Sequence, residues 1–121
     1  SSSDSGNGSM VSYAMQFLGN RYVWGGTSLT NGTDCSGFTM GIYRHFGISI
    51  PRTSAAQASA SRSVKSSEVR PGDLFFYGSG HVSHVAMYIG GGKIIHASNA
   101  RDGIKISNAY YRKPLKIGRF S

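Results

Sequence analysis

The chain has 121 residues and a formal net charge of +8, from 13 Lys and Arg against 5 Asp and Glu. This length predicts one domain, large enough to bury a core without disulfide or metal staples. So few carboxylates exclude an EF-hand and disfavour a two-carboxylate glycosidase. A single cysteine excludes an internal disulfide and a cysteine-based structural zinc site, and no apolar run approaches the roughly 20 residues of a membrane span. The acidic residues are Asp4, Asp34, Glu68, Asp73 and Asp102.

Residues 1–9 read SSSDSGNGS, a composition typical of a flexible linker that tethers a domain to another. A frayed terminus or a cloning scar is the alternative. No signal peptide is recognisable. We therefore expect a linker or terminus over residues 1–9 and one folded domain over residues 10–121.

Three helices are predicted in the first half of the chain. Apolar residues at helical spacing predict a helix over Met10–Leu18, with Ser9 as its N-cap and Gly19 at its end. The glycines and polar residues of 21–34 predict a loop.

The second helix is predicted over Cys35–Phe46, with Asp34 as N-cap and Gly47 as C-terminal cap. Its apolar stripe is Phe38, Ile42 and Phe46. A short third helix should start near Thr53 or Ser54.

The second half of the chain reads as strands. They are expected over Leu74–Tyr77, His84–Ile89 and Lys93–Ala97, with weaker candidates at Ile104–Ser107 and Lys116–Phe120. Gly90–Gly92 predicts a tight hairpin between the second and third. Helices followed by an antiparallel sheet indicate an α+β domain with the helices packed on one side of the sheet.

Cys35 is the first candidate for chemistry, because it opens the predicted second helix. Unpaired N–H groups and the partial positive charge of a helix N-terminus stabilise a thiolate, and such placement can lower a cysteine pKa. The small neighbours Ser36 and Gly37 leave room for a substrate. A buried cysteine acting as a small hydrophobic residue is the alternative.

A thiolate nucleophile needs a base, and that base needs an orienting partner. If the three glycines form a hairpin turn, His84 and His96 lie near each other on adjacent antiparallel strands. A helix docked on that face would bring Cys35 within reach of His84, and His96 would orient His84. His45 and His81 read as structural or loop histidines, and a zinc triad of His81, His84 and His96 matches no metal-site spacing.

Six strings along the chain carry a resemblance: YVWGG (22–26), DCSGF (34–38), PRTS (51–54), PGDLFF (71–76), HVAMYIG (84–90) and IIHAS (94–98). Together they resemble the NlpC-type family of papain-like cysteine peptidases of bacterial cell walls. The resemblance spans nearly all of residues 10–120. One departure is Ala86, where the family more often has glycine; its methyl should matter only if it faces the helix.

The resemblance implies a papain-like fold and a catalytic Cys35–His84–His96 arrangement, without metal or cofactor. It implies that Tyr22 positions the substrate or the oxyanion. By the same resemblance Asp34 and Ser36 contact the substrate.

Each of these secondary roles has a structural alternative. Ser83 could line the same pocket, and Trp24 is a further substrate-binding candidate. Asp34 could serve only as a helix cap, and Tyr22 and Trp24 only as core or rim aromatics. Asp73 and Arg52 read as structural, Arg52 as a surface or loop-fixing charge.

The function implied by the resemblance is peptidoglycan hydrolysis, by a cysteine endopeptidase that cuts the stem peptide between γ-D-glutamate and the diamino acid, diaminopimelate or lysine. An amidase or cross-bridge endopeptidase with the same site, or a non-catalytic wall-binding module, remains open.

The net charge of +8 would attract the domain to anionic wall polymers. The basic residues are scattered along the chain rather than clustered, which disfavours a nucleic-acid partner. We expect a secreted or wall-associated bacterial protein, monomeric and tethered through its N-terminal linker.

Overall fold

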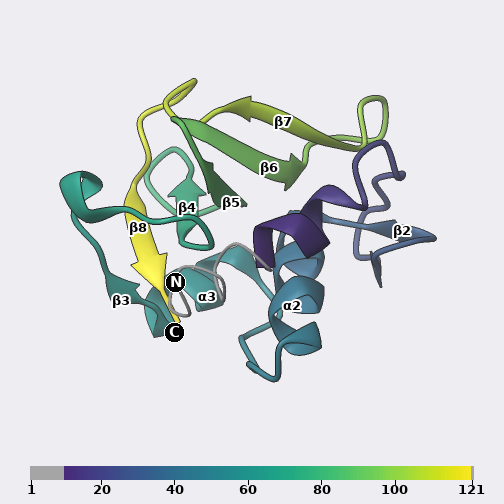
Figure 1. The fold of residues 1–121 in the computed structure, drawn as a ribbon, viewed down its shortest axis with the longest axis horizontal. Helices are drawn as coiled ribbons and strands as arrows, with labels where there is room; N and C mark the ends of the chain where they lie inside the picture. The colour runs from purple at the N-terminus through teal and green to yellow at the C-terminus, as the bar shows by residue number, and fades with distance from the viewer. Residues whose placement is uncertain (1–9, 121) are drawn as a thin grey trace.

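The computed structural model describes residues 10–120 (Figure 1). The expected linker and the Ser9 cap lie outside this range. The helical elements are α2 Cys35–His45, α3 Ser54–Ala60 and a 3-10 turn Ser66–Glu68. The strands are β1 Thr27–Ser28, β2 Gly32–Thr33, β3 Arg62–Ser63, β4 Leu74–Tyr77, β5 His84–Gly90, β6 Lys93–Ala97, β7 Ile104–Asn108 and β8 Lys116–Arg119.

Six strands form one sheet in the order β3-β8-β4-β5-β6-β7, and every neighbouring pair is antiparallel. The five predicted strands are confirmed to within one residue at each end. The hairpin between β5 and β6 is also confirmed, with a register shift between Tyr88 and Gly90.

The sheet buries both of its faces. Alternate residues of the central strands, including Val85, Met87 and Ile95, pack against Phe38 and Ile42 of α2. The opposite face, with Ala86 and Ile94, is buried in a second cluster. Figure 1 shows α2 and α3 on the same side of the sheet, as expected for the α+β class.

Helix α2 begins and ends at defined caps. The Asp34 carboxylate accepts a hydrogen bond from the Gly37 backbone N–H at 2.7 Å, which satisfies an orphan donor of the first turn. At the other end Gly47 adopts a φ of +81°, and the Ile48 N–H donates to the Tyr43 carbonyl, as in a Schellman motif. The expected buried stripe is wrong at Phe46, which follows the helix and is 36% exposed.

The predicted first helix is shorter than expected. Residues 10–15 are helical, and residues 16–19 form turns. The N–H groups of Phe17 and Leu18 donate to carbonyls three residues back, which tightens the chain out of α geometry. Met10, Ala14 and Phe17 are buried, but Leu18 is 39% exposed.

The predicted loop 21–34 contains a missed two-stranded hairpin, β1–β2, and β3 was also missed. Each of these strands has only two residues, too few to show an alternating pattern. Gly32, at a φ of +138°, pairs with Ser28. This hairpin holds the segment before α2 in place.

Two buried polar groups tie the elements together. The Gln57 amide of α3 donates to the Ser36 and Pro51 carbonyls at 3.0 and 2.9 Å. Asp73 pairs with Arg119 at 2.8 Å and is structural, as expected. Buried polar groups satisfied in this way fix the packing of α3 and β8.

Candidate active site

Cys35 is the first residue of α2 and is partly buried. The Val85 backbone N–H, at the beginning of β5, lies close enough to the Cys35 sulfur to lower the pKa of the thiol. The helix itself packs on the sheet face formed by Val85 and Met87. The thiol is therefore near the backbone of the residue that follows His84, and the expected reach between Cys35 and His84 stays a prediction.

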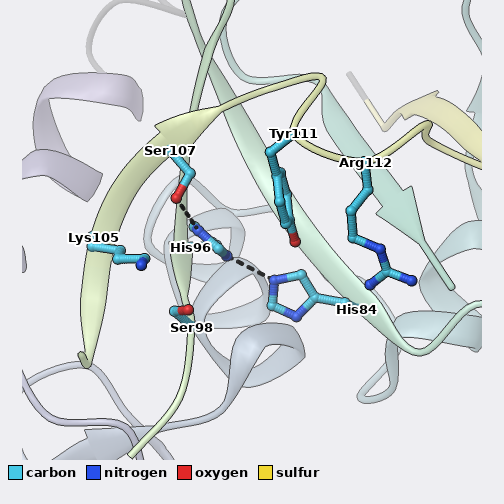
Figure 2. Close-up of a pocket in the computed structure, with 7 residues that line it drawn as sticks. All are labelled: His84, His96, Ser98, Lys105, Ser107, Tyr111 and Arg112. Carbon is cyan, nitrogen blue, oxygen red and sulfur yellow. Dashed lines mark hydrogen bonds between the residues drawn. The ribbon is translucent and has the colours of Figure 1, made fainter. Parts of the chain in front are cut away.

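His84 and His96 form a direct hydrogen bond, with His84 Nε2 and His96 Nδ1 2.7 Å apart (Figure 2). The two rings cross at 74° with centroids 5.0 Å apart. The second nitrogen of His96, Nε2, lies 2.9 Å from Ser107 Oγ. The expected proximity of the two histidines is confirmed, and they belong to a chain of three hydrogen-bonded side chains from β5, β6 and β7.

Ser107 is a residue that sequence reasoning missed. Ser107 of β7 pairs with Ile94 of β6. Ile94 lies two residues before His96 on the same strand, so the side chains of Ser107 and His96 point to the same face of the sheet. That register depends on the length of the loop at residues 98–103. The sequence alone showed no signal for it.

Burial and neighbouring charge shift the pKa values of the central groups. Burial, and then the Arg112 charge, lowers the pKa of His84 to about 4. Burial, His84 and Lys105 lower the pKa of His96 to about 3. The pKa of Cys35 is raised, by burial and the Asp34 charge, despite hydrogen bonds from backbone N–H groups that lower it. The expectation of a lowered Cys35 pKa is therefore wrong, because desolvation outweighs the helix N-terminus.

Asp34 carries more than the helix cap. Arg52 donates from Nη1 to Asp34 Oδ1 at 3.1 Å and from Nη2 to Oδ2 at 3.0 Å. Arg52 Nη1 also donates to Ser36 Oγ at 2.8 Å. Arg52 thus fixes the segment around the thiol, in agreement with its predicted loop-fixing role, and engages both oxygens of Asp34.

The remaining predicted residues surround the thiol to different degrees. Tyr22 lies close enough to Cys35 and Asp34 that their negative charges, after burial, raise its pKa. Trp24 is 86% exposed. Ser83 is exposed, and its backbone N–H donates to the Tyr77 carbonyl at 2.9 Å. Ala86 lies on the face away from α2, so its extra methyl does not meet the helix.

A pocket of about 290 Å³ opens against the histidine pair (Figure 2). Tyr111 lies beside both rings, with its ring centroid 6.0 Å from that of His96. Sequence reasoning named only the two histidines, because the segment between β7 and β8 has no periodic pattern. The pocket is lined by His84, His96, Ser98, Lys105, Ser107, Tyr111 and Arg112.

The other histidines lie apart from this pair. His45 stacks on Tyr13 with ring centroids 3.8 Å apart, and His81 is exposed in the loop before β5. Within residues 10–120, no three His, Cys, Asp or Glu side chains form a cluster that could hold a metal ion. No helix in this described range is long and apolar enough to cross a membrane.

The fold and the cysteine–histidine site together define a papain-like α+β domain. Residues 19–117 match the model of the NlpC/P60 family, and the chain belongs to that family.

Solved structures agree. An NlpC/P60 family protein from Bacillus cereus superposes with a TM-score of 0.86 at 38% identity, over 92% of this chain and 39% of that one. The NlpC/p60 domain of peptidoglycan hydrolase SagA gives 0.84 at 34% identity, over 94% and 98%.

Curated relatives include peptidases. The chain is 43% identical over 103 residues to a probable endopeptidase p60 of Listeria innocua, which covers 84% of this chain and 21% of the relative. It is 44% identical over 101 residues to a gamma-D-glutamyl-L-lysine dipeptidyl-peptidase of Bacillus cereus, covering 80% and 30%. The chain therefore spans less than a third of the length of these two relatives.

Proposed function

We propose that this chain is the catalytic domain of a cysteine endopeptidase that cuts peptidoglycan stem peptides between γ-D-glutamate and the diamino acid. The observation that carries the chemistry is the hydrogen-bonded His84–His96 pair. The thiol at the start of α2 lies near the backbone of Val85, the residue after His84. The choice of bond is supported by the name of the Bacillus cereus relative.

The hydrogen bonds assign the two nitrogens of His84 different tasks. Nε2 is engaged by His96 Nδ1, so Nδ1 remains to serve the thiol. For Nδ1 to accept a proton, Nε2 must carry the ring hydrogen and donate it to His96. His96 then carries its own hydrogen on Nε2 and donates it to Ser107 Oγ. The chain of hydrogen bonds thus selects the tautomer that a general base requires.

Catalysis begins from a neutral pair, because the pKa of Cys35 is raised and that of His84 lowered. The thiol proton passes to His84 Nδ1 as sulfur attacks the carbonyl carbon and a C–S bond forms. His84 then gives this proton to the leaving amine as the C–N bond breaks. Water, deprotonated by His84, hydrolyses the thioester and regenerates the thiol. This sequence uses no metal or organic cofactor.

The developing oxyanion needs donors near the sulfur. The backbone N–H of Cys35, at the beginning of α2, faces the sulfur closely enough to lower its pKa. We assign it to the oxyanion, together with the Tyr22 hydroxyl. Donors fixed before the reaction stabilise the transition state without reorganisation.

On the acyl side we propose Tyr22, Asp34 and Ser36 as substrate contacts, with exposed Trp24 and Ser83 at the rim. Arg52 already pairs with Asp34, so a substrate ammonium at Asp34 would lie beside a guanidinium. The repulsion between these two cations weakens selection for a free N-terminal amine. We therefore expect stems still attached to sugar to be cut as well as free stems.

We further propose that the domain acts outside a bacterial cell on the wall. Its formal net charge of +8 attracts anionic wall polymers over distances limited by salt screening. A flexible N-terminal tether and a monomeric state complete this proposal.

Digestion of purified muropeptides, followed by mass spectrometry of the products, tests the function. The wild-type chain should yield L-Ala–γ-D-Glu ends, free or still on muramic acid, and Cys35→Ala should yield none while keeping the wild-type circular dichroism spectrum. Thiol alkylation should remove activity and EDTA should leave it unchanged.

Other products would contradict the proposal. Release of whole stems with free muramic-acid lactyl groups would identify an amidase, and a cut in the bridge would identify a cross-bridge endopeptidase. Binding to walls without hydrolysis would indicate a binding module.

A further inference from the structure

The pocket beside the histidine pair has no assigned role in the chemistry above. Its lining comes from β5, β6, the loop after β6, β7 and the segment after β7. It includes neither Cys35 nor the acyl-side contacts Tyr22, Asp34 and Ser36. Its volume of about 290 Å³ suits one side chain or a small terminal group.

The position of His84 tells which half of the substrate reaches this pocket. The acyl half becomes bonded to Cys35, on the α2 side of His84. The leaving amine receives its proton from His84 itself, so the residue that carries this amine lies against His84. His84 lines the pocket, whereas Cys35 and the acyl-side contacts do not, so we assign the pocket to the leaving-group side of the scissile bond.

The pocket carries positive charge. Figure 2 shows the Arg112 guanidinium on the His84 side and the Lys105 amine on the far side of the pair. Both cations are close enough to lower the histidine pKa values. The Lys105 amine is partly neutralised by Asp102, 3.1 Å away. Within residues 10–120 Arg112 has no hydrogen-bond or ion-pair partner, and its side chain is exposed.

We propose that this pocket binds a carboxylate of the leaving fragment, with Arg112 as its principal partner and Lys105 as the second. An arginine fork binds carboxylates in a bidentate manner. Ser98, Ser107 and Tyr111 add hydroxyl groups to the lining. The inference rests on the proposed function, because the leaving side is defined by the cut bond.

A pocket of this kind would discriminate between stems that contain diaminopimelate and stems that contain lysine. The side chain of meso-diaminopimelate ends in an ammonium and a carboxylate, whereas that of lysine ends in an ammonium alone. A cationic pocket repels the lysine end and pairs with the diaminopimelate end. The terminal carboxylate of the stem is a second source of the same group, and the experiment must distinguish the two.

The test measures kcat/KM for four stem peptides that share the L-Ala–γ-D-Glu half. The third residue is meso-diaminopimelate, its side-chain amide, or lysine, and the fourth peptide is the diaminopimelate stem amidated at its C-terminus. Wild type should lose about tenfold when the carboxylate that occupies the pocket is amidated, as expected for a hydrogen bond to a charged group. The amide that causes the loss identifies the source.

Variants assign the effect to the pocket. In Arg112→Gln the same amidation should cost less than about threefold, and Arg112→Lys should retain part of the sensitivity because it keeps the charge. Arg62→Gln, an exposed arginine on β3, is the matched control and should behave as wild type. Substitution of Arg112 also changes the basicity of His84, but this change affects all substrates alike and cancels in the ratio of their kcat/KM values.

Two results overturn the inference alone: cleavage of the diaminopimelate stem and both amides at equal rates, or equal sensitivity to amidation in wild type and Arg112→Gln. A wild-type chain that cuts none of the four stems, while remaining folded, overturns the proposed function and the inference together.

Discussion

Burial decides the protonation of the three central side chains. A helix N-terminus favours a thiolate, yet the desolvation of Cys35 and the charge of Asp34 raise its pKa. The same burial lowers the pKa of His84 to about 4. Both shifts favour a thiol and a neutral imidazole at rest, and in the proposed mechanism charge separation belongs to the reaction step.

The two histidines should respond differently to substitution. His84→Gln removes the proton carrier of the proposed mechanism and should lower kcat about 10²- to 10⁴-fold. His96→Gln leaves a neutral hydrogen-bonding side chain that still orients His84, and should lower kcat only about 10- to 100-fold. Ser107→Ala, which removes one neutral hydrogen bond, should have the smallest effect.

Steady-state kinetics on a stem peptide measures this order, with His81→Gln as the control histidine in an exposed loop. Equal and complete loss in folded His84→Gln and His96→Gln would show that His96 does more than orient its neighbour.

The N-terminal turn of α2 is the element on which the site depends. Gly37 packs there against the Gly26 carbonyl, and a Cβ at this position would lie 2.6 Å from Thr33 Oγ1 and 2.9 Å from Asp34 Oδ1. The β1–β2 hairpin thus fits against the helix only if residue 37 has no side chain.

Gly37→Ala should destabilise the domain by about 3 kcal/mol, because backbone and cap atoms must move to admit the methyl group. Gly41→Ala lies in the same helix but meets only the flexible Leu29 side chain, at 3.0–3.3 Å. It should stay within about 1 kcal/mol of wild type, since alanine is the better helix former. Urea unfolding measures both, and equal losses would contradict the role of the hairpin contact.

The sequence predicted the elements with long or well-capped patterns. Asp34 and Gly47 marked α2, and short apolar runs next to glycines marked β4, β5 and β6. It missed β1, β2 and β3, because two residues are too few to show a pattern, and β3 also pairs with the distant strand β8.

The same limit applies to the site. The predicted hairpin at Gly90–Gly92 was enough to place His84 near His96, because a short turn fixes the register of the two strands that it joins. The positions of Lys105 and Ser107 beside the histidines depend on the loop at residues 98–103. The position of Arg112 depends on the irregular segment between β7 and β8. Packing of the whole domain sets the geometry of both segments. The Cys35 pKa was misjudged because burial cannot be read from a helix start.

At the scale of the whole molecule, the buried histidines link the fold to pH. Their pKa values are about 4 for His84 and about 3 for His96, both below the roughly 6.5 of an unfolded histidine. Between these limits the unfolded chain binds more protons than the folded one. The free energy of unfolding is therefore unaffected by them above pH 6.5 and falls as pH decreases from about 6.5 toward 4.

A comparison of variants separates the contribution of the buried histidines to the pH dependence of stability from that of the carboxylates. Each buried neutral histidine contributes a slope of up to about 1.4 kcal/mol per pH unit, so His96→Gln should show a shallower loss of stability than wild type between pH 6.5 and 4. His81→Gln should keep the wild-type slope, because His81 is exposed. Urea unfolding at several pH values gives these slopes, and the carboxylate contribution cancels in the difference between variants. A slope in His96→Gln equal to that of wild type would show that His96 accepts a proton in the folded domain over this pH range, and the lowered pKa of His96 would then be wrong.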